Sequence, residues 1–158
     1  MLDYSALQQQ TTVHPRAVRQ NLFLTSNYFH CLMLLHASEN ESAGVSANIK
    51  AALEAAHEAV WAFFKLWGLF ETEAGVWWVF QHRAFEESLL IAHLLATVPQ
   101  QDDDQGLATS SKSDPIFAKC KDDIARMMDI MDRYSGGSLE MHKTRKDVLV
   151  EAFAKTNI

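Results

Sequence analysis

Residues 43–67, AGVSANIKAALEAAHEAVWAFFKLW, carry apolar side chains at intervals of three and four residues. The apolar positions are Ile49, Leu53, Ala56, Val60, Phe63, Phe64 and Trp67. This spacing gathers them on one face of a helix with 3.6 residues per turn, so the stretch is predicted to be an amphipathic α-helix. Gly68 follows directly and is expected to end it, because glycine is common just after a helix C-terminus.

Four more segments show the same helical periodicity, at residues 16–36, 75–98, 116–134 and 139–155. Residues 89–95 are almost all apolar, which is typical of a central helix covered by its neighbours. No stretch alternates polar and apolar residues for long enough to predict a β-strand. The sequence therefore predicts an all-α fold of about five helices, packed as an irregular helical bundle.

A chain of 158 residues has the size of one domain, and we interpret residues 1–158 as a single helical domain or a fragment of one. Residues 1–14 are expected to be flexible. Residues 99–115, PQQDDDQGLATSSKSDP, are acidic and have no periodicity, so they are expected to form a mobile loop. At the end of this loop Asp114 is expected to cap a helix whose first residue is Pro115.

The formal net charge of −6 argues against direct nucleic-acid binding by this chain, because phosphate contacts need clustered Lys and Arg. The longest apolar run, residues 89–98, is far shorter than the roughly 20 residues that span a membrane. Cys31 and Cys120 are too few for a disulfide framework and indicate a reducing compartment. We therefore expect a nuclear or cytoplasmic chain that binds neither nucleic acid nor membrane.

Motifs of nucleophilic and phosphoryl-transfer catalysis are absent, since the sequence has neither a Gly-x-Ser-x-Gly elbow nor a phosphate-binding glycine loop. No enzymatic activity and no cofactor are expected.

An alternative stays open: an autonomous bundle that binds a metal or a small hydrophobic cofactor, as a metal-dependent enzyme would. Glu54-x-x-His57 has the one-turn spacing of di-iron carboxylate bundles, and Glu86 is the third candidate ligand. The competing interpretation gives these side chains a solvated or capping role.

Aromatic residues are dense between positions 61 and 85. Large aromatic side chains dominate both ligand pockets and protein interfaces, so they are candidate contacts for a small hydrophobic effector or a protein partner. The candidates are Trp61, Phe64, Trp67, Trp77, Trp78 and Phe85. The competing interpretation is a hydrophobic core around a helix hairpin. Because adjacent helical residues point about 100° apart, we expect Trp77 or Trp78 to be partly exposed.

Residues 28–36, YFHCLMLLH, resemble a helix in the regulatory domain of fungal zinc-cluster transcription factors, often called the middle homology region. Residues 77–85, WWVFQHRAF, and residues 133–135, RYS, resemble two later helices of that domain in the same order. The chain departs from the family pattern at residues 37–38, where the family has arginine and proline, and at Asn48, where it has cysteine. The resemblance corresponds to the later portion of the family's domain.

This resemblance implies a non-catalytic regulatory domain of a fungal-type transcription factor. Such a domain regulates transcription through intramolecular contacts, a protein partner or homodimer, or a small hydrophobic effector. In the family it lies downstream of a DNA-binding cluster of six cysteines. The present sequence has only two cysteines, so DNA binding is not carried over and no residue corresponds to a zinc ligand.

Overall fold

The computed structural model describes residues 4–39, 41–44, 46–97, 114–135 and 140–157. Within these ranges every regular element is helical and no strand is present, which confirms the all-α class. The expected number of about five helices is wrong, because the described chain has seven. They are α1 (Tyr4–Val13), α2 (Pro15–Ala37), α3 (Ile49–Leu69), α4 (Glu71–Val76), α5 (Trp78–Thr97), α6 (Pro115–Ser135) and α7 (Glu140–Ala154), with short 3-10 turns at Glu41–Ala43 and Lys155–Asn157.

The first additional helix is α1, which lies in the segment 1–14 that was expected to be flexible. Its residue Leu7 is buried, so burial of an apolar side chain holds α1 against the bundle. Gly68 was expected to end α3, but the helix continues for one more residue, to Leu69. A Cβ atom at Gly68 would lie only 2.8 Å from the Tyr4 hydroxyl, so this glycine gives α1 room to pack.

The second additional helix arises because the predicted segment 75–98 is broken at Trp77. The residues before it form the short helix α4, with Glu71 and Glu73 in its first turn, where negative charge suits the helix dipole. The following residues form α5. The break is one residue long and turns the chain between the two helices.

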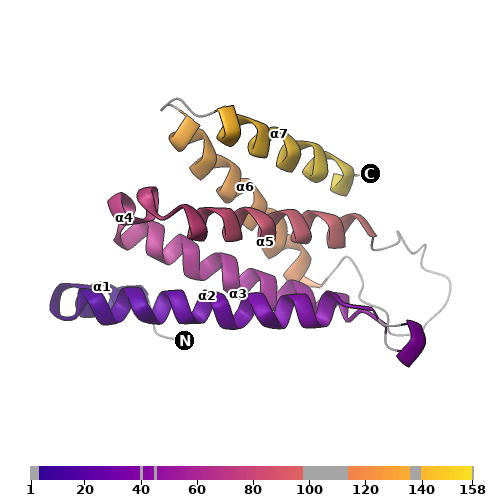
Figure 1. Cartoon of the computed structure of the whole chain (residues 1–158), viewed down its shortest axis with the longest axis horizontal. Helices are drawn as coiled ribbons and strands as arrows, with labels where there is room; N and C mark the ends of the chain where they lie inside the picture. The colour runs from indigo at the N-terminus through magenta and orange to yellow at the C-terminus, as the bar shows by residue number, and fades with distance from the viewer. Residues whose placement is uncertain (1–3, 40, 45, 98–113, 136–139, 158) are drawn as a thin grey trace.

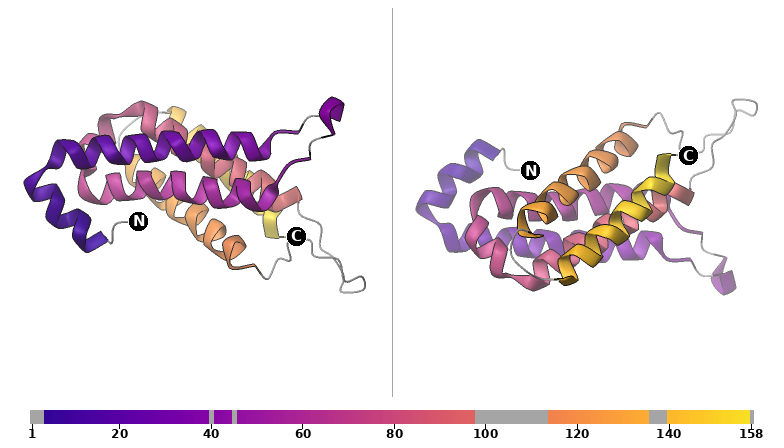
Figure 2. Two further views of the ribbon diagram at one scale, coloured as in Figure 1. Left: turned by 90° about the horizontal axis from the view of Figure 1, so that it is seen from below. Right: turned by 90° about the horizontal axis from the view of Figure 1, so that it is seen from above.

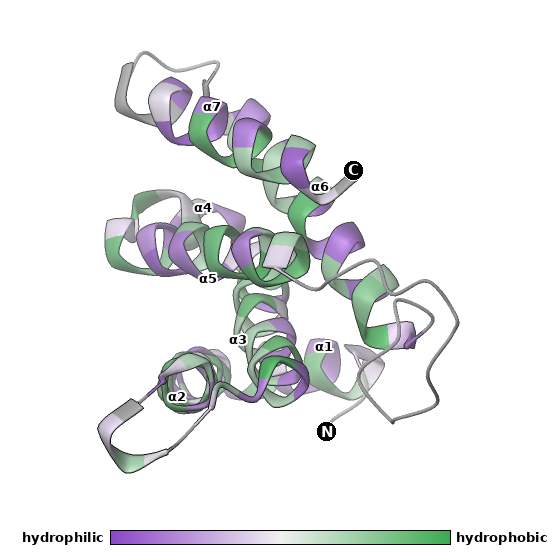
Figure 3. Ribbon diagram, turned by 90° about the vertical axis from the view of Figure 1, so that its right-hand side faces the viewer, coloured by the Kyte–Doolittle hydropathy of each residue, from purple (hydrophilic) through white to green (hydrophobic). Residues whose placement is uncertain are grey.

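The helices form three layers (Figures 1 and 3). The antiparallel pair α2 and α3 packs along its whole length, and α5 lies on the other side of α3. Helices α6 and α7 cover α5, and α6 crosses the α2–α3 pair obliquely (Figure 2). Helix α3 is thus the middle of the core, and Phe63, Phe64 and Leu66 on it are almost fully buried. The apolar residues of α5 that were expected to be central include Ile91 and Leu95, which are buried.

Side-chain caps define two of the helix starts. The Asn48 side chain accepts a hydrogen bond from the Ala51 amide at the start of α3. Asp114 accepts one from the Ile116 amide at 3.1 Å, which confirms the predicted start of α6. The Lys50 ammonium lies 2.6 Å from Asp114 and joins the two starts. Of the loop predicted at 99–115, residues 99–113 lie outside the described chain.

In the part of the chain that the structure describes, no helix has the length and apolar character needed to cross a membrane.

Candidate ligand-binding groove

A groove of about 810 Å³ lies between the first half of α2 and the junction of α4 with α5. Its residues come from two segments that are more than fifty positions apart in the sequence. They are Arg16, Arg19, Gln20, Phe23, Leu24, Trp77, Trp78, Val79 and Phe80. The groove is therefore a product of the tertiary fold.

The walls of the groove are apolar and unusually exposed. Leu24 is 62% exposed, Trp78 is 49% exposed and Val79 is 51% exposed. The rings of Phe23 and Phe80 lie with their centroids 4.9 Å apart and join the two walls. Contiguous apolar surface of this kind, rimmed by polar groups, is typical of an interaction site.

The two tryptophans owe their positions to the helix break. Trp77 follows the last residue of α4, and Trp78 is the first residue of α5. The buried Gln81 side chain holds this junction, because its Nε2 donates hydrogen bonds of 2.8 Å to the carbonyl oxygens of Ala74 and Gly75. These carbonyls belong to the last turn of α4, where the helix itself offers them no partner. The junction is thus fixed by a side chain that the sequence analysis did not single out.

Two arginines form the positive part of the rim. The Arg19 guanidinium lies 3.0 Å from the Glu73 carboxylate and over the ring of Phe70, 4.9 Å from its centroid. Arg16 is exposed and forms no ion pair with any residue that the structure describes. No acidic residue lines the groove among the described residues, so Arg16 carries an uncompensated positive charge at its edge.

The six aromatic candidates are divided between the groove and the core. Phe64, Trp67 and Phe85 are buried and do not line the groove. Trp61 is half-buried on α3, where the Arg126 guanidinium lies 5.3 Å from its ring centroid. These four side chains pack inside or along the bundle. This agrees with the competing interpretation, in which the aromatic residues form a hydrophobic core.

Trp77 and Trp78 are the two candidates that the structure places in the groove, and both are partly exposed. The other wall of the groove, which α2 provides, was not predicted from the sequence. Phe23 and Leu24 lie outside the stripe of α2 that contains the buried Val18 and Leu22. Apolar residues away from the buried stripe of a helix were the signal that could have indicated a second contact surface.

The alternative metal site is not assembled. His57 contacts Asp123 on α6, and Glu86 is an exposed residue of α5 that pairs with His82 at 3.3 Å. Glu54 is exposed on α3. Among the residues that the structure describes, no three His, Cys, Asp or Glu side chains form a group that could hold a metal ion.

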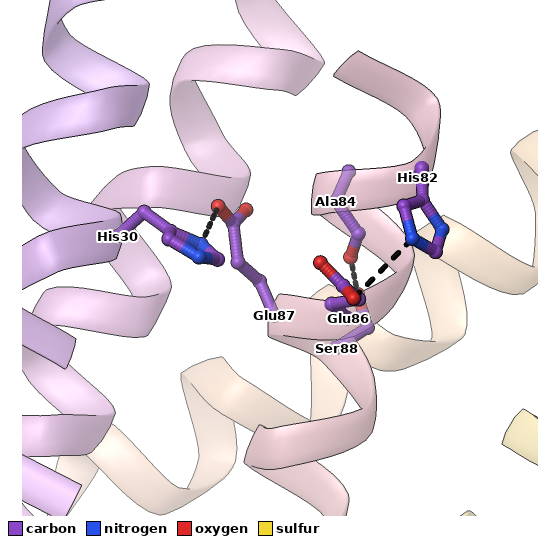
Figure 4. Close-up of polar contacts among 6 residues, drawn as sticks. All are labelled: His30, His82, Ala84, Glu86, Glu87 and Ser88. Carbon is purple, nitrogen blue, oxygen red and sulfur yellow. Dashed lines mark hydrogen bonds and ion pairs between the residues drawn. The ribbon is translucent and has the colours of Figure 1, made fainter. Parts of the chain in front are cut away.

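The structure does contain two buried histidine–carboxylate pairs that the sequence did not reveal. His30 Nδ1 on α2 lies 3.0 Å from Glu87 Oε1 on α5 (Figure 4), and His57 Nδ1 lies 2.6 Å from Asp123 Oδ2. Burial raises the pKa of both carboxyl groups, and in each case the paired histidine opposes part of the shift. The pairs connect α2 with α5 and α3 with α6 across the core.

No family model matches the chain, and neither the curated proteins nor the solved structures contain a match.

Proposed function

We propose that this chain is a non-catalytic regulatory module that binds a small amphipathic molecule with an anionic group in the groove between α2 and the α4–α5 junction. One observation carries the proposal. Trp77 and Trp78 expose their rings in an apolar hollow whose edge holds the unpaired guanidinium of Arg16. A ligand there would cover apolar surface and satisfy a charge at the same time.

The size of the groove supports a small molecule. Its volume of about 810 Å³ falls within the range of about 300–1,000 Å³ that is usual for small-molecule sites. Such sites combine apolar and aromatic walls with a few polar groups that orient the ligand. Here the walls are Phe23, Trp78 and Val79, and the orienting groups are Gln20 and the two arginines.

The charge of the groove supports an anion. A guanidinium matches the geometry of carboxylate or sulfonate oxygens, which it can bind through two parallel hydrogen bonds. Arg19 is already paired with Glu73, so Arg16 is the expected anchor. The negatively charged Glu73 faces Arg19 and does not line the groove.

The regulatory part of the proposal is supported by the resemblance to fungal zinc-cluster transcription factors, whose regulatory domains respond to small molecules or partners. On this proposal the module acts in transcription regulation, in the nucleus or the cytoplasm. The position of the groove fits such a role, because a ligand would contact α2 and the α4–α5 junction together. Occupancy would therefore favour one relative placement of these helices.

The experiment is a titration of the chain with anilinonaphthalene sulfonate, an aromatic anion whose fluorescence increases in apolar sites. We expect saturable binding at one site, strong loss of affinity in Trp78→Ala and partial loss in Arg16→Gln. Leu35→Ala is the matched control, because it removes an exposed apolar side chain from the other end of α2.

Equal binding by the wild type and Trp78→Ala would contradict the proposal. So would a chain that forms dimers which Trp78→Ala dissociates, because the groove would then be an interface between two copies. Sedimentation of both proteins without the probe distinguishes this outcome from ligand binding.

A further inference from the structure

A second cavity, of about 510 Å³, lies where α1, α2 and α3 meet. It shares no lining residue with the groove. Val18, Leu22 and Ala62 form a buried apolar floor, and Thr25 is exposed at its mouth. The other lining residues are Leu7, Gln10, Asn21, Phe29, Glu58 and Lys65.

Lys65 is the unusual residue of this cavity. It is only 9% exposed and lies on α3 between Phe64 and Leu66, which are almost fully buried. Its ammonium forms no hydrogen bond or ion pair with any described residue. Lysines that are this buried are normally paired, since removing an unpaired charge from water costs free energy.

The surroundings of Lys65 disfavour its charged form relative to an exposed lysine. Burial lowers the pKa of the Lys65 ammonium, and the negative charge of Glu58 opposes part of this shift. A desolvated lysine amine at the wall of a cavity is a nucleophile, and this is the usual setting of lysines that form imines.

Glu58 decides which class of ligand the cavity fits. It lies two turns before Lys65 on α3, about 10.5 Å along the helix axis, and it also lines the cavity. With Lys65 charged, the two side chains carry opposite charges, so neither an anionic nor a cationic ligand gains a net attraction from the pair. A neutral molecule with a short apolar body fits the floor of Val18, Leu22 and Ala62.

We infer that this cavity captures a small neutral aldehyde as an imine on the amine of Lys65. The amine nitrogen attacks the carbonyl carbon, a C–N bond forms, and the carbonyl oxygen takes up a proton to give a carbinolamine. Loss of water then leaves a C=N bond. Glu58 lines the same cavity without an ion pair to Lys65, so it would exchange the protons of both steps through water. No oxidant or reductant is needed, and hydrolysis reverses the reaction.

The experiment treats the full chain with pentanal and sodium cyanoborohydride at neutral pH and maps the alkylated lysines by peptide mass spectrometry. Lys50 is the matched control, because Asp114 raises the pKa of its exposed ammonium. We expect the alkylated fraction at Lys65 to exceed that at Lys50 severalfold in the folded protein. The difference should disappear in concentrated urea.

Two variants test the cavity itself. Thr25→Trp places a large ring at the exposed mouth and should reduce alkylation of Lys65 severalfold while leaving Lys50 unchanged. Glu58→Gln keeps the shape of the side chain but removes the carboxylate that raises the pKa of the Lys65 ammonium; slower alkylation of Lys65 despite this gain in neutral amine would assign the proton exchange to Glu58. Equal labelling of Lys65 and Lys50 in the folded wild type would overturn the inference, as would a Thr25→Trp variant that labels like the wild type.

Discussion

His30 on α2 and Glu87 on α5 are 57 residues apart in the sequence, yet His30 Nδ1 lies 3.0 Å from Glu87 Oε1 inside the bundle. Glu87 has no exposed surface, and its second oxygen, Oε2, has no hydrogen-bond partner among the described residues. The imidazole is therefore the group that compensates this carboxyl side chain. His57 and Asp123 form the corresponding link between α3 and α6.

Replacing His30 by alanine is expected to destabilise the fold, because it leaves the Glu87 carboxyl group buried without its partner. We expect a loss of about 3 kcal/mol in the free energy of unfolding, the lower end of the range for breaking a buried pair, since Glu87 can take up a proton. Urea denaturation measures this loss. The control is His93→Ala on the exposed side of α5, which should change the stability by less than about 0.5 kcal/mol. Equal effects of the two substitutions would show that the pair does not stabilise the bundle.

The pH dependence of stability should change in Glu87→Gln. Burial raises the pKa of the Glu87 carboxyl group, His30 and Arg83 oppose the shift, and Glu86 adds to it. The folded protein therefore holds this proton at pH values where the unfolded chain has lost it. Its contribution to stability consequently falls as the pH rises above the usual glutamate value of 4.5.

An amide does not titrate, so Glu87→Gln removes this contribution to the pH dependence. We expect the free energy of unfolding of Glu87→Gln, relative to that of the wild type, to increase from acidic to neutral pH. Urea denaturation at a series of pH values measures the two curves, with Glu54→Gln on the exposed face of α3 as the control. Two parallel curves for Glu87→Gln and the wild type would contradict the argument.

The α4–α5 junction should depend on Gln81. Gln81→Leu removes the donors to the carbonyl oxygens of Ala74 and Gly75 but keeps the approximate volume of the side chain. We expect a loss of about 1–3 kcal/mol in stability, because a buried acceptor is left unsatisfied. Hydrogen exchange should be faster in α4, and binding of anilinonaphthalene sulfonate should weaken. Unchanged exchange in α4 would mean that other contacts hold the junction.

The aromatic candidates should separate into two classes by their effects on stability. Phe64→Ala creates a cavity beside an almost fully buried ring and is expected to cost about 3–5 kcal/mol. Trp77→Ala truncates a ring that is 40% exposed, so its cost should be clearly smaller. Thermal unfolding of both variants measures the difference, and a larger loss in Trp77→Ala than in Phe64→Ala would contradict the division.

Helical periodicity sufficed to locate most of the fold. The predicted segments 16–36 and 116–134 agree closely with α2 and α6, because each carries one continuous apolar stripe. The break at Trp77 was not predicted, although Gly75, which has a low helix propensity, lies two residues before it. It depends on Gln81, which reaches back to α4 only in the folded chain. Helix α1 was missed because tertiary burial of Leu7 holds it.

The candidate site was predictable only in part. The sequence predicted that Trp77 or Trp78 would be partly exposed, and both are, but not through the turn of a helix, because Trp77 lies at the break between α4 and α5. Only the tertiary structure brought Arg16 and Leu24 to face them, and only the tertiary structure paired His30 with Glu87. Local periodicity fixes which face of a helix is apolar. Which distant face it meets, and which charges are left without a partner, depends on how the helices pack in three dimensions.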